Sequence, residues 1–299
     1  MKGSRMNDPR PSQTDRATEI ERALHVRVAR EARRQKWLAE MTVAVGRALL
    51  IGLILGLWAL AALHEANAES ISNPVAVFNA LYELIKSGRL WSDLWQTVFE
   101  VLSGYAAGVV VALAVASLFV IFPVLEEATR PLLIAIYSIP KVALAPLIVM
   151  WFGLASAPKI ILAGGFVFFV VFMNIVTGVE SVNRHHVNIV RVMGAGRFSV
   201  LFKIVLPTII PFLCLGLRLA IPEAMIGAVI GEFISANRGL GYMVYSASNE
   251  LNTAVSMAAL VVLVIVVAVG DVSLGWLERL WLPRGLQQTN TGAAIANNR

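Results

Sequence analysis

The sequence is poor in charged residues and has one cysteine. Only 15% of its 299 residues are charged and 58% are hydrophobic, whereas soluble domains average about 25% charged and about 45–50% apolar residues. This composition excludes an ordinary water-soluble fold. The cysteine, Cys214, lies inside an apolar run, which excludes a disulfide framework and a thiolate metal cluster.

Motifs for catalysis and nucleotide binding are also missing. The sequence has no GxxxxGK[ST] loop, no HExxH, no Ser, His and Asp arrangement and no paired carboxylate site. His185 and His186 point in different directions on a helix and lack a ligand set, so we expect no metal site. We predict that the chain is not an enzyme and holds no cofactor. The net charge of +6 is interpreted as a signal of membrane topology rather than of nucleic-acid binding.

Apolar runs of membrane-spanning length are abundant. A helix needs about 20 residues to cross about 30 Å of hydrocarbon. We therefore predict an all-α, polytopic membrane bundle with six transmembrane helices. The six segments cover about residues 43–63, 99–122, 131–152, 160–179, 209–234 and 253–271. Gly104 and Gly108 form a small-xxx-small pair in the second segment, which predicts close helix packing.

Lys and Arg are spread unevenly among the loops between these segments. Nineteen lie on the side of the N-terminus and three on the opposite side. Because cytoplasmic loops carry the excess of positive residues, both termini are predicted to be cytoplasmic.

The two ends of the chain are predicted to differ from its membrane part, residues 43–284. Residues 1–42 are expected to form a cytoplasmic arm, disordered over about the first seventeen residues and helical after them, and residues 285–299 a disordered cytoplasmic tail. After the first span, Asn73 and Pro74 begin a segment with apolar residues at helical spacing. This pattern predicts an amphipathic external helix near the membrane surface.

The cytoplasmic loop at about residues 180–208 is longer than a connection between membrane helices needs to be. Gly194 and Gly196 permit a tight reversal, and after them Phe198 and Leu201 begin apolar positions at spacings of three and four. The pattern predicts a helix, a glycine turn and a second short amphipathic helix. Such a helix favours docking into a hydrophobic groove on another protein.

The run GAGRFSVLFKIVLPTIIP in this loop resembles the cytoplasmic EAA loop of membrane subunits of bacterial ATP-binding-cassette importers. The residues that match its pattern are Gly194, Ala195, Leu206, Pro207 and Pro211. Asn188, Ile189 and Val190 replace the Glu-Ala-Ala triplet. The segments SIPKVALAPLIVMWFGL, GLRLAI and GEFISANRGLGYMV are similar to the branch that imports nitrate, taurine, alkanesulfonates and related small molecules. The resemblance covers roughly residues 70–284.

The resemblance implies an inner-membrane permease that moves its solute by alternating access. Its implied partners are a second permease copy, with a homodimer as the simplest arrangement, two cytoplasmic ATPase subunits that hold ATP and Mg, an external solute-binding protein and membrane lipid. A coupling helix at residues 188–202 would follow the ATPase, and a sulfonate, taurine or nitrate-like anion would be the solute. The residues assigned to the coupling loop are Asn188, Arg191, Gly194, Ala195, Gly196, Arg197, Phe198, Leu201 and Pro207.

Polar residues inside the predicted spans are candidates for the translocation path. An ionisable side chain there costs about 2.5–3.5 kcal/mol on insertion scales, so it usually faces the bundle interior or a water-filled path. The candidates are Lys141, Asn174, Arg218, Glu223 and Glu232.

Each candidate also has a structural interpretation. Arg218 could snorkel to the headgroups or pair inside the bundle, Asn174 could form a hydrogen bond between helices, and Glu232 could be an interfacial carboxylate at the external end of its span. Lys141 follows Pro140 and precedes Pro146, which predicts that the third span is broken near mid-membrane.

Two other functions stay open at this point. A secondary transporter driven by an ion gradient could use Lys141, Arg218, Glu223 and Asp271 as relay groups, although the sequence has no inverted pair of interrupted spans. A membrane scaffold without a path is the third possibility.

Overall fold

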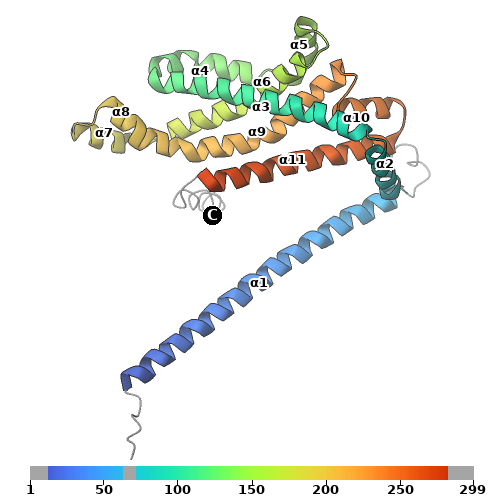
Figure 1. The fold of residues 1–299 in the computed structure, drawn as a ribbon. Coiled ribbons are helices and arrows are strands. Elements are labelled where there is room, and N and C mark those ends of the chain that lie inside the picture. The colour runs from blue at the N-terminus through green and yellow to red at the C-terminus, as the bar shows by residue number, and fades with distance from the viewer. Residues whose placement is uncertain (1–12, 63–71, 282–299) are drawn as a thin grey trace, which may run out of the picture. The chain divides into compact units, whose positions relative to one another are not determined.

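The computed structural model describes residues 13–62 and 72–281, and within these ranges all regular elements are helices (Figure 1). The chain divides into two units, residues 1–67 and 68–299, which are described separately. The predicted tail and the first part of the predicted arm lie outside the described residues.

The described residues of the first unit form one long helix, α1 (Gln13–Ala62), of 50 residues. It runs without a break through the predicted arm and the first predicted span. The part from Trp37 to Ala62 is long and apolar enough to cross a membrane. The helix begins at Gln13, whereas the composition placed its start after residue 17.

The second unit is a bundle of ten α-helices among its described residues. They are α2 (Pro74–Lys86), α3 (Arg89–Ile121), α4 (Pro123–Tyr137), α5 (Ala145–Phe152), α6 (Ala157–Glu180), α7 (Arg184–Val192), α8 (Arg197–Val200), α9 (Leu206–Ser235), α10 (Leu240–Asn249) and α11 (Thr253–Trp281). A 3₁₀ turn, Lys141–Leu144, precedes α5, and a π-helical turn, Leu201–Val205, joins α8 to α9. The predicted external helix is α2, whose N-cap Asn73 accepts a hydrogen bond from the Ala76 amide at 2.7 Å.

The predicted membrane spans coincide with helices of the structure. Five described helical stretches are long and apolar enough to span a membrane, and a bent pair on either side of Pro140 makes six if it counts as one span. The two arms of that pair, Pro131–Tyr137 and Lys141–Phe152, meet at 79°. The break expected beside Lys141 is therefore confirmed.

The core of the bundle is formed by α3, α6 and α9, which lie side by side in Figure 1. Small residues bring these helices together. A Cβ atom added to Gly108 of α3 would lie 2.5 Å from the Gly164 carbonyl oxygen and 2.8 Å from Cβ of Val167, both on α6. Gly227 of α9 lies equally close to α6, with Ala163 Cα at 2.7 Å from such an added atom. The close packing predicted from the small-xxx-small pair is confirmed.

Gly108→Ala is expected to destabilise the bundle, because its new methyl group would force α3 and α6 apart. Overpacking of this kind costs about 1–3 kcal/mol. Thermal unfolding of the purified chain in detergent measures the loss. Gly165→Ala is the matched control, since a Cβ at Gly165 of α6 would meet no atom within 4 Å. Gly165→Ala should unfold at or above the temperature of the parent chain, and an equal fall for both variants would contradict the packing argument.

The two ends of this bundle carry different elements. Helices α7 and α8 lie at one end, called here the loop end, and α10 lies with α2 at the opposite end, called here the α10 end (Figure 1). Because α9 follows α8 and precedes α10, this single helix of 30 residues connects the two ends.

Candidate functional site

The predicted coupling loop forms the expected helix, turn and helix. Asn183 caps α7 by accepting a hydrogen bond from the His185 amide at 2.9 Å. The helix ends at Val192, and Gly194, two residues further on, has φ of +89°, in the left-handed region that favours glycine. Amide to carbonyl hydrogen bonds from Gly194 to Arg191 and from Ala195 to Val190 close the end of the helix.

The nine predicted coupling residues are spread over this motif and its exit. Asn188 and Arg191 lie on α7, Gly194, Ala195 and Gly196 in the turn, Arg197 and Phe198 on α8, Leu201 in the π turn and Pro207 in the first turn of α9. The side chains of Arg197 and Phe198 lie outside the described part of the structure. Leu201 is half-buried against its own chain, so it is not part of an exposed apolar face.

Exposed apolar residues lie on α7 and in the turn as well as in the π turn, where Phe202 is 62% exposed. Ile189, Val192 and Met193 expose 57%, 89% and 80% of their surface. Their exposure was not predicted, because the apolar positions at spacings of three and four begin only after the glycines. The signal was present as two apolar residues directly before Gly194, where a helix ends and side chains project from its last turn.

The broken third span places Lys141 among aromatic rings. Its Nζ atom lies 4.7 Å from the ring centre of Tyr137, 5.2 Å from Phe166 and 5.6 Å from Phe169. Tyr137 belongs to the arm before the break, and the two phenylalanines belong to α6. The ring faces stabilise the charge of Lys141, and among the described side chains no carboxylate pairs with it.

Arg218 pairs with α11 and not with Glu223. Its Nε atom lies 3.1 Å from Glu278 Oε2 and 4.0 Å from Asp271 Oδ1. Glu223 is half-buried one and a half turns further along α9. Arg218 therefore pairs with carboxylates of its own chain, but its side chain is 43% exposed, so the pair lies at the surface of the chain and not in its interior.

Asn174 does not form the expected hydrogen bond between helices in the described structure. Its Nδ2 atom donates to the Val170 carbonyl oxygen of its own helix, α6, at 2.8 Å. The side chain instead packs against α9, where a Cβ atom at Gly216 would lie 2.9 Å from Asn174 Cβ. The absence of a Cβ at Gly216 lets the helices approach without a polar bridge.

Glu232 is fully buried, which corrects its interpretation as an interfacial carboxylate. It lies near the end of α9 at the α10 end. Its Oε1 atom accepts a hydrogen bond from the Thr97 hydroxyl at 2.7 Å, and its Oε2 atom accepts one from the Gly241 amide at 2.6 Å.

A buried ion pair lies at the same end of the bundle. Lys159 Nζ of α6 is 3.1 Å from Glu100 Oε1 of α3, and Gln96 Nε2 donates to the same oxygen at 2.6 Å. Lys159 and Glu100 were missed because both lie at the edges of their predicted spans, where charge is ordinary. The signal was that each edge is followed by a charge-free run.

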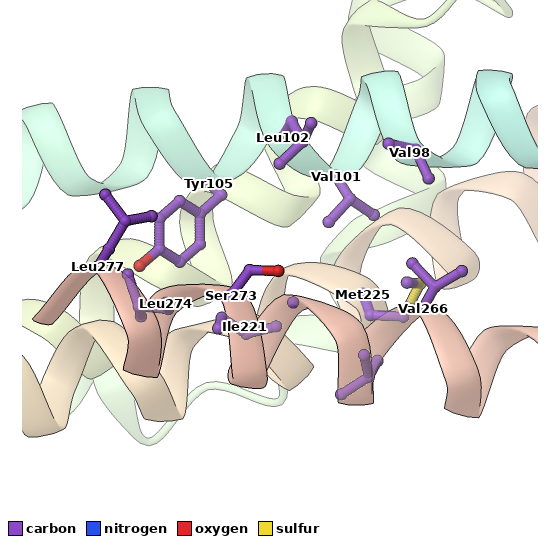
Figure 2. A pocket seen from close by; sticks show the side chains of 12 residues that line it. Val98, Val101, Leu102, Tyr105, Ile221, Met225, Val266, Ser273, Leu274 and Leu277 are labelled. Atoms are coloured by element: carbon purple, nitrogen blue, oxygen red, sulfur yellow. The ribbon is translucent and has the colours of Figure 1, made fainter. Parts of the chain in front are cut away.

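An apolar cavity of about 300 Å³ lies between α3, α9 and α11 (Figure 2). Its two hydroxyl groups are already bonded within the chain, Tyr105 to the Leu217 carbonyl at 3.0 Å and Ser273 to the Val269 carbonyl at 2.6 Å. The other lining residues are apolar, such as Val101, Met225 and Leu274. The cavity offers a charged solute no free hydrogen-bonding group.

The described part of the chain contains no group of three or more metal-ligating side chains.

Comparison with known proteins identifies the family. The profile of the family described as binding-protein-dependent transport system inner membrane component matches residues 75–284. The chain belongs to this family. The predicted family resemblance and multi-pass inner-membrane location of this permease are thereby confirmed.

Individual relatives of the permease are transport permeases with different named solutes. The riboflavin transport system permease protein RibX of Chloroflexus aurantiacus is 30% identical over 238 residues, 79% of this chain and 89% of the relative. The formylaminopyrimidine transport permease protein ThiX of Halalkalibacterium halodurans is 28% identical over 231 residues, 77% and 92% of the two chains. The taurine transport system permease protein TauC of Escherichia coli is 28% identical over 261 residues, 84% and 94%.

A solved structure supports the fold. The inward-facing MetNI methionine ABC transporter contains a chain that aligns with 66% of this permease and 98% of its own length, with a TM-score of 0.53 and 21% identity. The permease therefore has the fold of that importer's membrane subunit.

Proposed function

We propose that the permease is the translocation subunit of an ATP-driven importer in which α7 and the Gly194 turn dock on a separate ATPase. The observation that carries this proposal is the exposure of Ile189, Val192 and Met193 on a short helix outside the membrane spans. Apolar side chains on such a helix are stabilised by an apolar groove on a partner. Movement of that partner would be passed through α8 and the π turn to α9.

The proposed assembly follows the family. It contains two copies of the permease, two ATPase subunits that bind ATP and Mg, and an external solute-binding protein, and the permease itself performs no catalysis. The excess of Lys and Arg in the N-terminal arm and in the loops assigned to the same side supports a cytoplasmic position for both termini. Residues 1–42 and 285–299 would then be cytoplasmic extensions of the membrane domain, residues 43–284.

The proposed solute is a small anion such as a sulfonate. TauC is named for taurine, and the relative SsuC of Escherichia coli, 28% identical over 249 residues, is named for aliphatic sulfonates. RibX and ThiX are named for heterocycles, so relatives alone do not decide. Lys141 favours the anion, because its ammonium group lies at a break in a membrane span with ring faces but no carboxylate among the described side chains.

Purification of the tagged permease from its native membranes tests the assembly. A polypeptide with ATPase activity should purify with it in mild detergent. If no ATPase accompanies the permease and uptake stops when the proton gradient is collapsed with ATP maintained, the gradient-driven transporter is correct instead.

Lys141→Met is expected to reduce taurine uptake at least about tenfold, because it removes the unpaired positive charge. The measurement is uptake of labelled taurine by proteoliposomes that contain the purified complex, its binding protein and internal ATP. Lys141→Arg keeps the charge and can stack on the same rings, so it should retain a larger share of the uptake. Equal uptake by the parent chain and Lys141→Met would contradict the anion-guiding role, whereas no uptake by any of them would contradict the choice of taurine.

A further inference from the structure

The first amide groups of α10 are capped by side chains of other helices. The N-cap residue, Gly239, has no side chain to supply the usual local cap. Instead the Gly239 amide donates to Asp93 Oδ1 at 3.2 Å, the Leu240 amide to Thr97 Oγ1 at 2.8 Å and the Gly241 amide to Glu232 Oε2 at 2.6 Å. Two of these acceptors belong to α3 and one to α9. We name Asp93, Thr97 and Glu232 the α10 clamp.

Thr97 is the centre of the clamp. Its hydroxyl accepts a hydrogen bond from the Leu240 amide and donates one to Glu232 Oε1, with 2.7 Å between the two oxygens, so one side chain of α3 contacts both α9 and α10. Thr97 and Glu232 are both fully buried. Because both side chains are buried, water cannot replace this hydrogen bond, and leaving either group without a partner would cost its desolvation.

The start of α10 also provides a favourable environment for the Glu232 carboxylate. No ion pair joins Glu232 to a Lys or Arg among the described residues, and Lys159 at the same end of the bundle pairs with Glu100. The N-terminus of a helix carries a partial positive charge and free amide groups, which stabilise an anion. If α10 moved away from α3 and α9, the buried carboxylate would lose its hydrogen bond from the Gly241 amide and the dipole of α10, and it would keep only the hydrogen bond from Thr97.

Two glycines allow the carboxylate to approach the backbone of α10. Gly239 has φ of +118°, a conformation that L side chains rarely adopt. A Cβ atom at Gly241 would lie 2.6 Å from Glu232 Oε2 and 3.1 Å from Glu232 Cβ. The glycines of the turn therefore fit the clamp residues. Gly241 is nine residues from Glu232 in the sequence, whereas Leu240 is 143 residues from Thr97.

The clamp joins α10 to α9, the helix that begins at the coupling loop. Glu232 lies on the last turn of α9, while the first turn of α9 continues from α8 through the π turn. The clamp therefore gives a displacement of α10 a direct path along α9 to the loop end.

We propose that Thr97, Glu232 and Asp93 are positioning residues that make α10 move as one body with α3 and α9, so that events at the α10 end are coupled to the ATPase at the loop end. This inference rests on the importer function proposed above. It requires that breaking the clamp uncouple ATP hydrolysis from transport without removing the ATPase.

Thr97→Val tests the clamp with little change of side-chain volume. The variant loses the hydroxyl that accepts from Leu240 and donates to Glu232, whereas the control Thr97→Ser keeps it. Hydrogen exchange of a peptide that covers residues 236–245, in the purified complex, should become at least about tenfold faster in Thr97→Val. In Thr97→Ser the rate should stay close to that of the parent chain.

Transport measured on the same complexes tests the coupling. In Thr97→Val, solute uptake should fall at least about tenfold, and the binding protein should no longer stimulate ATP hydrolysis. Basal ATP hydrolysis should stay within about twofold of the parent value. Thr97→Ser should keep both activities. A merely structural role for Thr97 would lower basal hydrolysis and ATPase association together with uptake.

Several results would overturn the inference. Unchanged exchange in Thr97→Val would show that the clamp does not hold α10, and faster exchange with normal uptake would show that transport does not use it. If Thr97→Val does not fold, Glu232→Gln, which keeps the side-chain shape and loses one acceptor, is measured in the same way, and failure of both to fold would assign these residues to folding alone. Absence of an ATPase from the parent complex would refute the importer function, whereas the exchange result would still report on the clamp.

Discussion

Val192→Asp is expected to reduce solute uptake at least about tenfold while the permease stays folded and inserted. The parent side chain exposes 89% of its surface at the end of α7 and contributes almost nothing to the packing of its own chain. The substitution can therefore affect uptake only through contact with a partner. A carboxylate placed in an apolar contact must lose its water or break the contact, and central interface residues commonly contribute 2 kcal/mol or more. Co-purification of the ATPase and uptake by the reconstituted complex are the two measurements.

His186→Asp is the matched control for Val192→Asp. It introduces the same charge at an exposed position of α7, six residues earlier. Six residues correspond to a rotation of about 240° away from Val192 along the helix. Uptake by His186→Asp should stay within about twofold of the parent value. Normal uptake and ATPase association in Val192→Asp would show that this face of α7 is not the docking surface.

Lys159→Met is expected to prevent accumulation of a stable permease. The Lys159 and Glu100 side chains are 5% and 0% exposed and pair at 3.1 Å. Glu100 Oε2 has no hydrogen-bond partner among the described residues, so the loss of Lys159 would leave the carboxylate with one amide donor, from Gln96. Removal of one partner of a buried ion pair costs about 3–5 kcal/mol, a large fraction of the stability of a domain. The yield of monodisperse protein and its thermal unfolding in detergent report this loss.

The double variant Lys159→Met with Glu100→Leu separates charge from packing. Since it removes both charges, it should recover most of the stability that the single variant loses. Lys86→Met, at an exposed lysine at the end of α2, should have little effect. Equal stability of Lys159→Met and the parent chain would contradict the importance of the pair.

The spans, the loop motif and the break beside Lys141 could be predicted because their signals are local. Hydropathy over about 20 residues locates a span, Gly194 marks a helix end and Pro140 cannot continue a helix. The small-xxx-small pair at Gly104 and Gly108 predicted close packing, although not that α6 is the neighbour. These features depend on residues that are close in the chain.

The α10 clamp could not be predicted, because its members are far apart in the sequence. Thr97 contacts Glu232 across 135 residues. Periodicity assigns each residue to a helix face but does not say which faces meet. The second span was also expected to begin at residue 99, whereas α3 begins at Arg89. Asp93 and Thr97 therefore fell in a predicted loop, where a carboxylate and a hydroxyl need no explanation.

The prediction for the coupling loop succeeded for the backbone and failed for one side chain. Spacing counted Leu201 as an exposed apolar residue of a second helix, but that helix, α8, has four residues and then widens into the π turn. Leu201 is half-buried as a result. Apolar periodicity does not reveal whether a face meets its own chain or a partner.

The π turn at Leu201–Val205 sets the angular phase between the loop and α9. A π-helical turn accommodates one residue more than an α-helical turn, and one residue in an α-helix corresponds to a rotation of about 100°. The direction in which α7 presents Val192 therefore depends on the backbone hydrogen-bond register of five residues. A change of the backbone hydrogen bonds there, from the π to the α pattern, would rotate the loop about the axis of α9 without altering any side chain.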